Sequence, residues 1–391
     1  MQNEIRSAST QKKNKVYSFW ETDAFFHYDY LVVGGGLVGL STAASLIEQA
    51  PQARILVLEQ ALFPRGASTR NAGFACFGSL TELWAEIEAE GEEAMCQRVA
   101  WRWEGLQRLC QRLGKEALAW ENHGGYELIL RPNFISPEKR EALNTLLKPL
   151  FGKAVFSDVS EKIAPFGFDA RQVGQLLWNP FEAQLHAGRM MAALQAYVQK
   201  RGVRLLNQCE VKSLQPTTDQ QKAEVLLANG EKTSFFAPKV AVCTNAFAPN
   251  LFPELRIRPG RGQVLITEPM PQLPFQGTFH FEEGYYYFRN VGQRILLGGG
   301  RNLDFVGETT IEIALHQVIQ QDLEDKLSQL IAPHRPIRIA QRWAGIMGFT
   351  SDRNPIVQNV GPGLWVGAGL NGMGVAIGTW VGHQLAQQMK T

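Results

Sequence analysis

The clearest pattern of apolar and polar positions lies near the start of the chain. An apolar run at residues 31–33 breaks into a glycine-rich turn at residues 34–39, and a helical spacing of apolar residues continues through residue 47. A second apolar run, at residues 55–58, ends at Glu59. The pattern predicts a strand, a turn, a helix, a second strand and an acidic residue, in that order.

The turn at residues 34–39 has the spacing G-x-G-x-x-G, which is typical of dinucleotide sites. Gly34 allows the tight turn, Gly36 lets the backbone approach a pyrophosphate, and Gly39 lets the helix pack closely on the strand. The phosphates then lie at the positive N-terminus of the helix, and the acidic residue accepts hydrogen bonds from an adenosine ribose. The residues that we expect around the dinucleotide in this unit are Gly34, Gly36, Leu37, Val38, Gly39, Glu59 and Gln60.

The rest of the chain alternates helical segments with short strands. We expect helices at residues 80–118, 188–201 and 309–331. Apolar runs of strand length lie at residues 126–130, 203–206, 224–227, 239–242, 263–267, 285–288 and 295–297. These patterns predict an α/β fold for the domain that carries the G-x-G-x-x-G turn, which is Rossmann-like. A second domain is built on an antiparallel sheet, so the chain as a whole is of the α+β class.

A second G-x-G-x-x-G sequence follows the apolar run at residues 364–366 and lies within the glycine-rich segment at residues 367–374. Because no further strand and acidic residue follow it, we expect a different use for this turn. A glycine-lined helix N-terminus offers unpaired N–H groups and about half a positive charge, which suits a group that becomes anionic during turnover. The carbonyl edge of a reduced flavin is such a group, and a tight packing turn between strand and helix is the alternative.

The composition is that of an ordinary globular enzyme. At 391 residues the chain exceeds what one hydrophobic core usually holds, so we expect two domains. The formal net charge of +2 gives no electrostatic reason to expect a nucleic-acid partner. The five cysteines are odd in number and form no C-x-x-C pair, which favours reduced thiols in a cytoplasmic protein without a metal site.

Two uncharged stretches, residues 30–47 and 354–382, could be mistaken for membrane spans. Both are interrupted by clusters of glycine where a span should be continuous helix, so we expect no membrane span. Residues 1–27 are expected to form an N-terminal tail, because the polar stretch through Lys15 lacks the apolar centre of a secretory signal.

Five further motifs occur in a fixed order along the chain. They are the loop at residues 66–73, Thr244-Asn245-Ala246, the segment at residues 258–263, the pair of segments at residues 285–289 and 297–300, and the segment at residues 350–355. With the two glycine turns, they make the chain resemble the D-amino-acid oxidase superfamily of FAD-dependent oxidoreductases, the group that contains glycine oxidase and sarcosine oxidase. The resemblance extends from Tyr28 to Gly382.

This resemblance implies a discontinuous FAD-binding domain at residues 28–79, 175–255 and 345–391, with a substrate domain at residues 80–174 and 256–344. It also implies that further residues contact FAD at its flavin ring system, at its adenine and at the pyrimidine edge of the flavin. These contacts would come from Ser68, Thr69, Asn71, Ala72, Gly73, Val211, Thr244, Asn245, Gly372, Met373 and Gly374. In sarcosine oxidase-like members a cysteine near residue 347 tethers the flavin. This chain has none beyond Cys243, so FAD should be non-covalent.

The resemblance implies oxidation of the C–N bond of a small amine or amino acid. The amine is bound unprotonated, a hydride passes to flavin N5, and the resulting imine hydrolyses; oxygen or another acceptor then reoxidises the flavin. No general base is needed, and the scattered His123, His186 and His280 are expected to be structural or surface residues. We expect the substrate pocket to contain Tyr286, Arg289 and Met347.

Met347 departs from the pattern of glycine oxidase-like members, in which an arginine at this place binds the substrate carboxylate. An amino-acid substrate would therefore need another cation, with Arg70, Arg261, Arg289 and Arg301 as candidates; otherwise the substrate is a neutral or polyamine-like amine. Two alternatives to this activity remain open. One is an oxidase that modifies an aminomethyl group of a tRNA base, and the other is a non-catalytic FAD-binding subunit of a larger complex.

Overall fold

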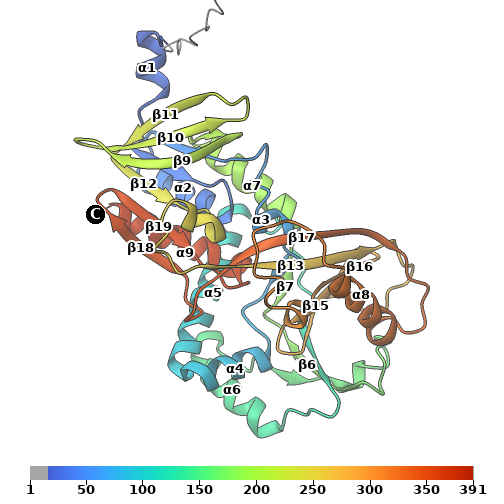
Figure 1. Cartoon of the computed structure of the whole chain (residues 1–391). Coiled ribbons are helices and arrows are strands. Elements are labelled where there is room, and N and C mark those ends of the chain that lie inside the picture. The colour runs from blue at the N-terminus through green and yellow to red at the C-terminus, as the bar shows by residue number, and fades with distance from the viewer. Residues whose placement is uncertain (1–15, 391) are drawn as a thin grey trace, which may run out of the picture.

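The computed structural model describes residues 16–390 (Figure 1). The expectation for residues 1–15 therefore lies outside the described residues. The α-helices are α1 Phe19–Phe25, α2 Leu37–Gln49, α3 Ala67–Arg70, α4 Leu80–Glu90, α5 Glu92–Leu113, α6 Pro137–Phe151, α7 Ala187–Gln199, α8 Gln317–Lys326 and α9 Gly374–Lys390. The short 3-10 and π turns are η1 Ser160–Lys162, η2 Asn245–Asn250, η3 Arg301–Leu303 and η4 Leu327–Ile331.

The strands form two large sheets and two small ones. The six-stranded sheet has the order β18 Ile356–Gly361, β19 Leu364–Ala368, β12 Lys239–Val242, β1 Tyr30–Val33, β2 Ile55–Leu58 and β8 Arg204–Leu206. The eight-stranded sheet has the order β17 Ile339–Phe349, β13 Arg258–Thr267, β16 Arg294–Gly299, β15 Tyr286–Val291, β14 Thr278–Phe281, β4 Gly125–Leu130, β6 Val173–Asn179 and β5 Ser157–Asp158. The small sheets are β11 Lys232–Ala237, β10 Gln221–Leu227 and β9 Cys209–Pro216, and β3 Phe74–Ala75 with β7 Ala183–Gln184.

The strand, turn, helix and strand predicted near the start of the chain are β1, the glycine turn, α2 and β2. β1 pairs in parallel with both β2 and β12, and the residues of β2 are buried without exception. Such continuous apolar runs suit a parallel sheet that is covered on both faces. Helices α2, α7, α5 and α9 share one hydrophobic core with this sheet, and the small sheet of β9, β10 and β11 contributes to a second core.

The eight-stranded sheet lies beside this unit, in the lower right of Figure 1. All of its pairings are antiparallel except the one between β14 and β4. Two of its strands cross limits that we expected between the domains: β6 continues to Asn179, and β17 continues to Phe349. Backbone pairing holds β6 against β4 and β17 against β13, so both strands belong to the eight-stranded sheet along their full length. If the domains are divided according to their sheets, the limits fall at residues 179 and 349, where we expected 175 and 345.

Residues 80–174 do not form a separate unit. Strand β4 is an inner strand of the eight-stranded sheet, and α5 packs against α9 near the C-terminus. At this crossing Gly105 lies directly against the carbonyl of Ala376, and Trp101 stacks on Trp380 with 4.6 Å between ring centroids. Helix α5 therefore joins the two large sheets.

Two expected segments differ from the structure. The helix expected at residues 309–331 begins only at Gln317, because residues 309–316 form bends and irregular chain before α8. Part of the expected tail is ordered: α1 begins with a capping box at Ser18 and presents Phe19 and Trp20 to solvent. Among residues 16–390, no helix is both long and apolar enough to cross a membrane.

Candidate active site

A large cavity of about 840 Å³ runs between the two large sheets. Its walls come from the glycine turn after β1, the loop around α3, the turn after β12, strands β13 and β17, and the start of α9. Small-molecule and cofactor sites have volumes of this order and occur preferentially where domains meet. The cavity is the candidate site, and its two ends are built differently.

At one end of the cavity the backbone forms the wall. Gly34 has φ of +104°, and its N–H donates to the Leu58 carbonyl at 2.8 Å. A Cβ atom at Gly39 would collide with the Gly34 carbonyl oxygen, so only glycine fits there. The first turn of α2 consequently lies close to β1, with the unpaired N–H groups of its N-terminus facing the cavity.

Two side chains complete this end. The Glu59 carboxylate accepts hydrogen bonds from the N–H of Gly35 at 2.9 Å and from the N–H of Ala61 at 3.0 Å, which fixes it at the end of β2. The Ser68 hydroxyl accepts a hydrogen bond from the N–H of Leu37 at 2.9 Å. The loop around α3 is thereby attached to the N-terminus of α2.

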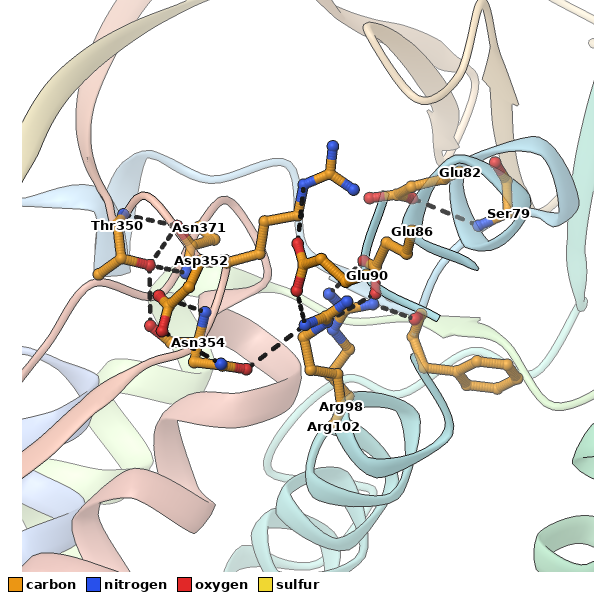
Figure 2. A network of polar contacts seen from close by, with 12 residues as sticks. Ser79, Glu82, Glu86, Glu90, Arg98, Arg102, Thr350, Asp352, Asn354 and Asn371 are labelled. Carbon is orange, nitrogen blue, oxygen red and sulfur yellow. Dashed lines mark hydrogen bonds and ion pairs between the residues drawn. The ribbon is translucent and has the colours of Figure 1, made fainter. Parts of the chain in front are cut away.

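The turn before α9 is held by two asparagines. The Asn371 side chain accepts from the N–H of Thr350 at 2.8 Å, a contact drawn in Figure 2, and donates to the Gly369 carbonyl at 2.7 Å. Asn245 accepts from the N–H of Gly369 at 2.9 Å. These bonds position the N-terminus of α9 in the cavity wall, and a Cβ atom at Gly372 would meet nothing within 4 Å.

The residues at this end fit a dinucleotide with a flavin. The helix N-termini of α2 and α9 both open on the cavity and suit a pyrophosphate and an anionic ring edge. The Thr244 hydroxyl is buried, lies in the cavity wall and has no hydrogen-bond partner among the described residues. Most of the expected cofactor residues line the cavity: Gly34, Gly36, Leu37, Val38, Glu59, Gln60, Ser68, Asn71, Ala72, Gly73, Val211, Thr244, Asn245, Gly372, Met373 and Gly374.

Two of the expected cofactor residues lie outside the cavity wall. Gly39 packs against the turn, as described above. Thr69 is not part of the wall, and its hydroxyl donates to the Pro64 carbonyl at 2.6 Å. Thr69 therefore shapes the loop around α3.

At the other end of the cavity, side chains of the eight-stranded sheet form the wall. Met347 lies there as expected, together with Tyr285 and Tyr287. Tyr286 does not, which corrects its placement in the substrate pocket. Because neighbouring residues of a strand face opposite sides, Tyr286 points into the core, where its hydroxyl donates to Asp322 at 2.7 Å.

Arg289 also lies outside the cavity wall, which corrects its expected place in the substrate pocket. It is buried behind Gly73 and donates to the Gly73 carbonyl at 3.2 Å. Burial lowers the pKa of its guanidinium to about 10. Its role is therefore to support the loop that carries Asn71 and Gly73.

His280 was expected to be structural or superficial, yet it is buried in the cavity wall beside Cys76. Its Nε2 lies 3.3 Å from Glu182, which also accepts from the Thr278 hydroxyl. Burial disfavours the charged ring, but Glu182 outweighs this effect and holds the pKa of His280 well above its usual value. Cys76, Glu182 and His280 bring ligand-type atoms within 4.8 Å of one another. No spacing in the sequence indicated this group.

Acidic residues of α4 complete the wall on this side (Figure 2). Burial raises the pKa of Glu82 to about 7. Glu86 lies between two arginines, at 2.8 Å from Arg98 and 2.7 Å from Arg102, and these partners lower its pKa in spite of burial. The sequence predicted a helical stretch at residues 80–118, but neither its division into α4 and α5 at Gly91 nor the charged groups that pair between them.

Comparisons with known proteins agree with this geometry. The model of the FAD dependent oxidoreductase family matches residues 29–388. The probable oxidoreductase OrdL of Rhizobium meliloti is 20% identical over 92% of this chain and 82% of its own length. The tRNA 5-methylaminomethyl-2-thiouridine biosynthesis bifunctional protein MnmC of Verminephrobacter eiseniae is 26% identical over 92% of this chain and 60% of its own length.

Among solved structures, glycine oxidase from Geobacillus kaustophilus superimposes with a TM-score of 0.69 at 20% identity, covering 94% of this chain and 96% of that one. The predicted mixed α/β fold with a Rossmann-like FAD unit is thereby confirmed, as are FAD as the cofactor and the oxidoreductase class. The match of the family model to nearly all of residues 16–390 decides the assignment. The chain belongs to the FAD dependent oxidoreductase family.

Proposed function

We propose that this enzyme oxidises the C–N bond of a small amine or amino acid. The observation that carries the proposal is the continuity of one cavity, from the glycine turn and the N-terminus of α9 to the wall that holds Tyr287 and Met347. A substrate bound against these two side chains shares the cavity with the ring system of the cofactor. When bound, the flavin supplies the acceptor for the hydride that leaves the substrate carbon.

The residues at this end bind and orient a substrate. Phe74 packs edge-on against both Tyr287 and His280, with ring centroids 5.6 and 5.2 Å apart. The rings of Phe74 and Tyr287 and the Met347 side chain make an apolar part of the wall, which limits the water around a reacting amine. Glu82, whose pKa lies near 7, is placed in the same wall to accept a proton from an incoming ammonium group.

We also propose that FAD is held without a covalent bond. Cys76, Cys209 and Cys243 reach the cavity wall, but burial raises the pKa of each thiol, that of Cys243 to about 12. A protonated thiol is a poor nucleophile. Acid precipitation should accordingly release free FAD into the supernatant, whereas colour in the precipitate would contradict this proposal. The five unpaired cysteines favour a reducing, cytoplasmic location.

The activity is tested by anaerobic mixing of the purified yellow protein with a panel of amines and amino acids. Bleaching of the visible flavin band, followed by detection of the carbonyl product, supports the proposal. A flavin that dithionite reduces but no member of the panel bleaches would contradict it and favour a non-catalytic FAD-binding subunit.

The similarity to a protein named for tRNA biosynthesis keeps a second candidate in view. An oxidase of a tRNA aminomethyl group would use the same cavity for the same bond. It would also need contacts to phosphates, which weaken steeply with salt. A gel shift with unmodified tRNA that disappears at raised salt supports this candidate, and the lack of any shift at low salt removes it.

A further inference from the structure

The four arginines considered for a substrate anion differ in their partners. Arg261 forms a buried ion pair with Glu308 at 2.6 Å, and Arg289 donates to the Gly73 carbonyl behind the wall. Arg70 reaches the cavity but donates to two carbonyls, those of Arg65 and Ala344. Each of these three guanidinium groups already donates to a partner in the protein, and Arg289, whose Nε has none, does not line the cavity.

Arg301 is different. It lies in the cavity wall at the start of η3, directly after β16. Among the described residues its guanidinium has no hydrogen bond and no ion pair, and its Nε is buried without a partner. A buried donor that lacks a partner is destabilising, so the fold retains this group at the expense of stability.

Aromatic rings and a glycine hold the Arg301 guanidinium in place. Its Cζ lies 4.3 Å from the ring centroid of Phe349 and 5.2 Å from that of Phe305, distances at which a cation is attracted to a ring. A Cβ atom at Gly260 would come within 3.0 Å of this Cζ. Gly260 pairs with Met347 across β13 and β17, so Arg301 places a cation beside the position where the arginine of related proteins is missing.

The position of Arg301 also indicates how far the anion lies from the reacting bond. Two residues of the cavity wall beside it are exposed to solvent: Tyr285 at 41% and Phe305 at 44%. Their rings lie 5.8 Å apart. Arg301 therefore stands at the rim of the cavity, and an anion bound to it lies toward solvent.

We propose that Arg301 binds the carboxylate of the substrate at the rim, so that the preferred substrate is an amine whose carboxylate is several bonds away from the oxidised C–N bond. This inference rests on the proposed amine oxidation. It places 4-aminobutanoate or 5-aminopentanoate ahead of glycine and sarcosine. Planar guanidinium groups suit carboxylates because they donate two parallel hydrogen bonds.

The first test compares the binding of two ligands that lack an oxidisable amine, one with a carboxylate and one with a neutral amide. In FAD-loaded protein, binding of pentanoate and of pentanamide is measured by the change in the flavin spectrum. Pentanoate should bind more tightly, and Arg301→Gln should weaken it by about 10- to 100-fold while leaving pentanamide unchanged. Arg301→Lys should keep part of the preference. Arg342→Gln is the control, because it removes a charge from β17 at a residue paired with Glu324 outside the cavity wall.

Rates of flavin reduction separate the proposed role of Arg301 from the proposed amine oxidation. 5-Aminopentanoate should bleach the flavin at lower concentrations than pentylamine, and Arg301→Gln should raise the concentration needed without changing the limiting rate. An unchanged pentanoate preference in Arg301→Gln, or equal binding of pentanoate and pentanamide by the unmodified protein, would overturn the role of Arg301. Intact pentanoate binding with no bleaching by any amine would instead overturn the proposed oxidation and leave the anion site standing.

Discussion

The two ends of the cavity are built from different parts of the polypeptide. At the cofactor end, backbone N–H groups and glycines form the wall, as at Gly34, Gly36 and Gly372. At the substrate end, side chains form it, among them Met347, Tyr287 and Arg301. A site made of backbone depends on glycine spacing, whereas a site made of side chains depends on which way each strand faces. The first kind can be read from sequence and the second kind only in part.

The largest expected effect breaks the cofactor end. Gly36→Val places a side chain where the pyrophosphate should approach, and its Cβ would lie 3.0 Å from the Ser68 hydroxyl. The variant should fold but contain no FAD, as measured by the ratio of visible to ultraviolet absorbance and by circular dichroism.

The matched control is Gly361→Val on β18. Its Cβ would meet only Leu364, at 3.9 Å. This variant should load FAD normally. Normal loading of Gly36→Val would show that the phosphates lie elsewhere.

The next effect concerns the charged group that joins α4 to α5 behind the substrate end (Figure 2). Glu86 has a side-chain exposure of 3% and pairs with both Arg98 and Arg102. Glu86→Gln should lower the free energy of unfolding in urea by about 3–5 kcal/mol, because it leaves the buried Arg102 without its counter-charge and removes one of the two carboxylates that pair with Arg98.

Glu104→Gln on the outer face of α5 is the control for this effect. Its pair with Arg108 is exposed at 43% and 35%, so the loss should be about 0.5 kcal/mol or less. Equal losses for the two variants would mean that the buried group contributes nothing beyond a surface pair.

The smallest effect is a pH dependence at the substrate end. Burial raises the pKa of Glu82 from 4.5 to about 7, so the unfolded chain releases this proton more readily than the folded protein. Stability should therefore fall as the pH rises from about 4.5 to about 7. The decrease in melting temperature between about pH 5 and about pH 8 should be smaller in Glu82→Gln than in the unmodified protein. Glu88→Gln changes an exposed residue of the same helix and should leave the decrease unchanged. Identical decreases in all three proteins would contradict the raised pKa of Glu82.

The cofactor end of the cavity could be predicted from the sequence more fully than the substrate end. The βαβ unit and the glycine turn before α9 could be predicted because the roles of Gly34 and Gly39 depend on local backbone geometry. The placement of Tyr286 in the substrate pocket was wrong because neighbouring residues of a strand alternate between its faces, and the sequence does not show which face is buried. Arg289 was misplaced for a related reason, since its hydrogen bond to Gly73 joins segments 216 positions apart.

His280 and Arg301 are two residues whose surroundings in the cavity wall could not be predicted from the sequence. His280 lies in the cavity wall beside Glu182, 98 positions away, and this carboxylate raises its pKa. Arg301 is identified only when the partners of the other arginines are known. Such contacts join distant strands, and no spacing along the chain reports them.

The central claim is that the substrate end presents a C–N bond, and not a C–O bond, to the flavin. The most direct test measures anaerobic flavin reduction by two matched compounds, 5-aminopentanoate and 5-hydroxypentanoate. The account predicts that the amine bleaches the flavin and yields the aldehyde and ammonia, while the alcohol leaves the flavin oxidised. Bleaching by the alcohol, with an unreactive amine, would contradict it.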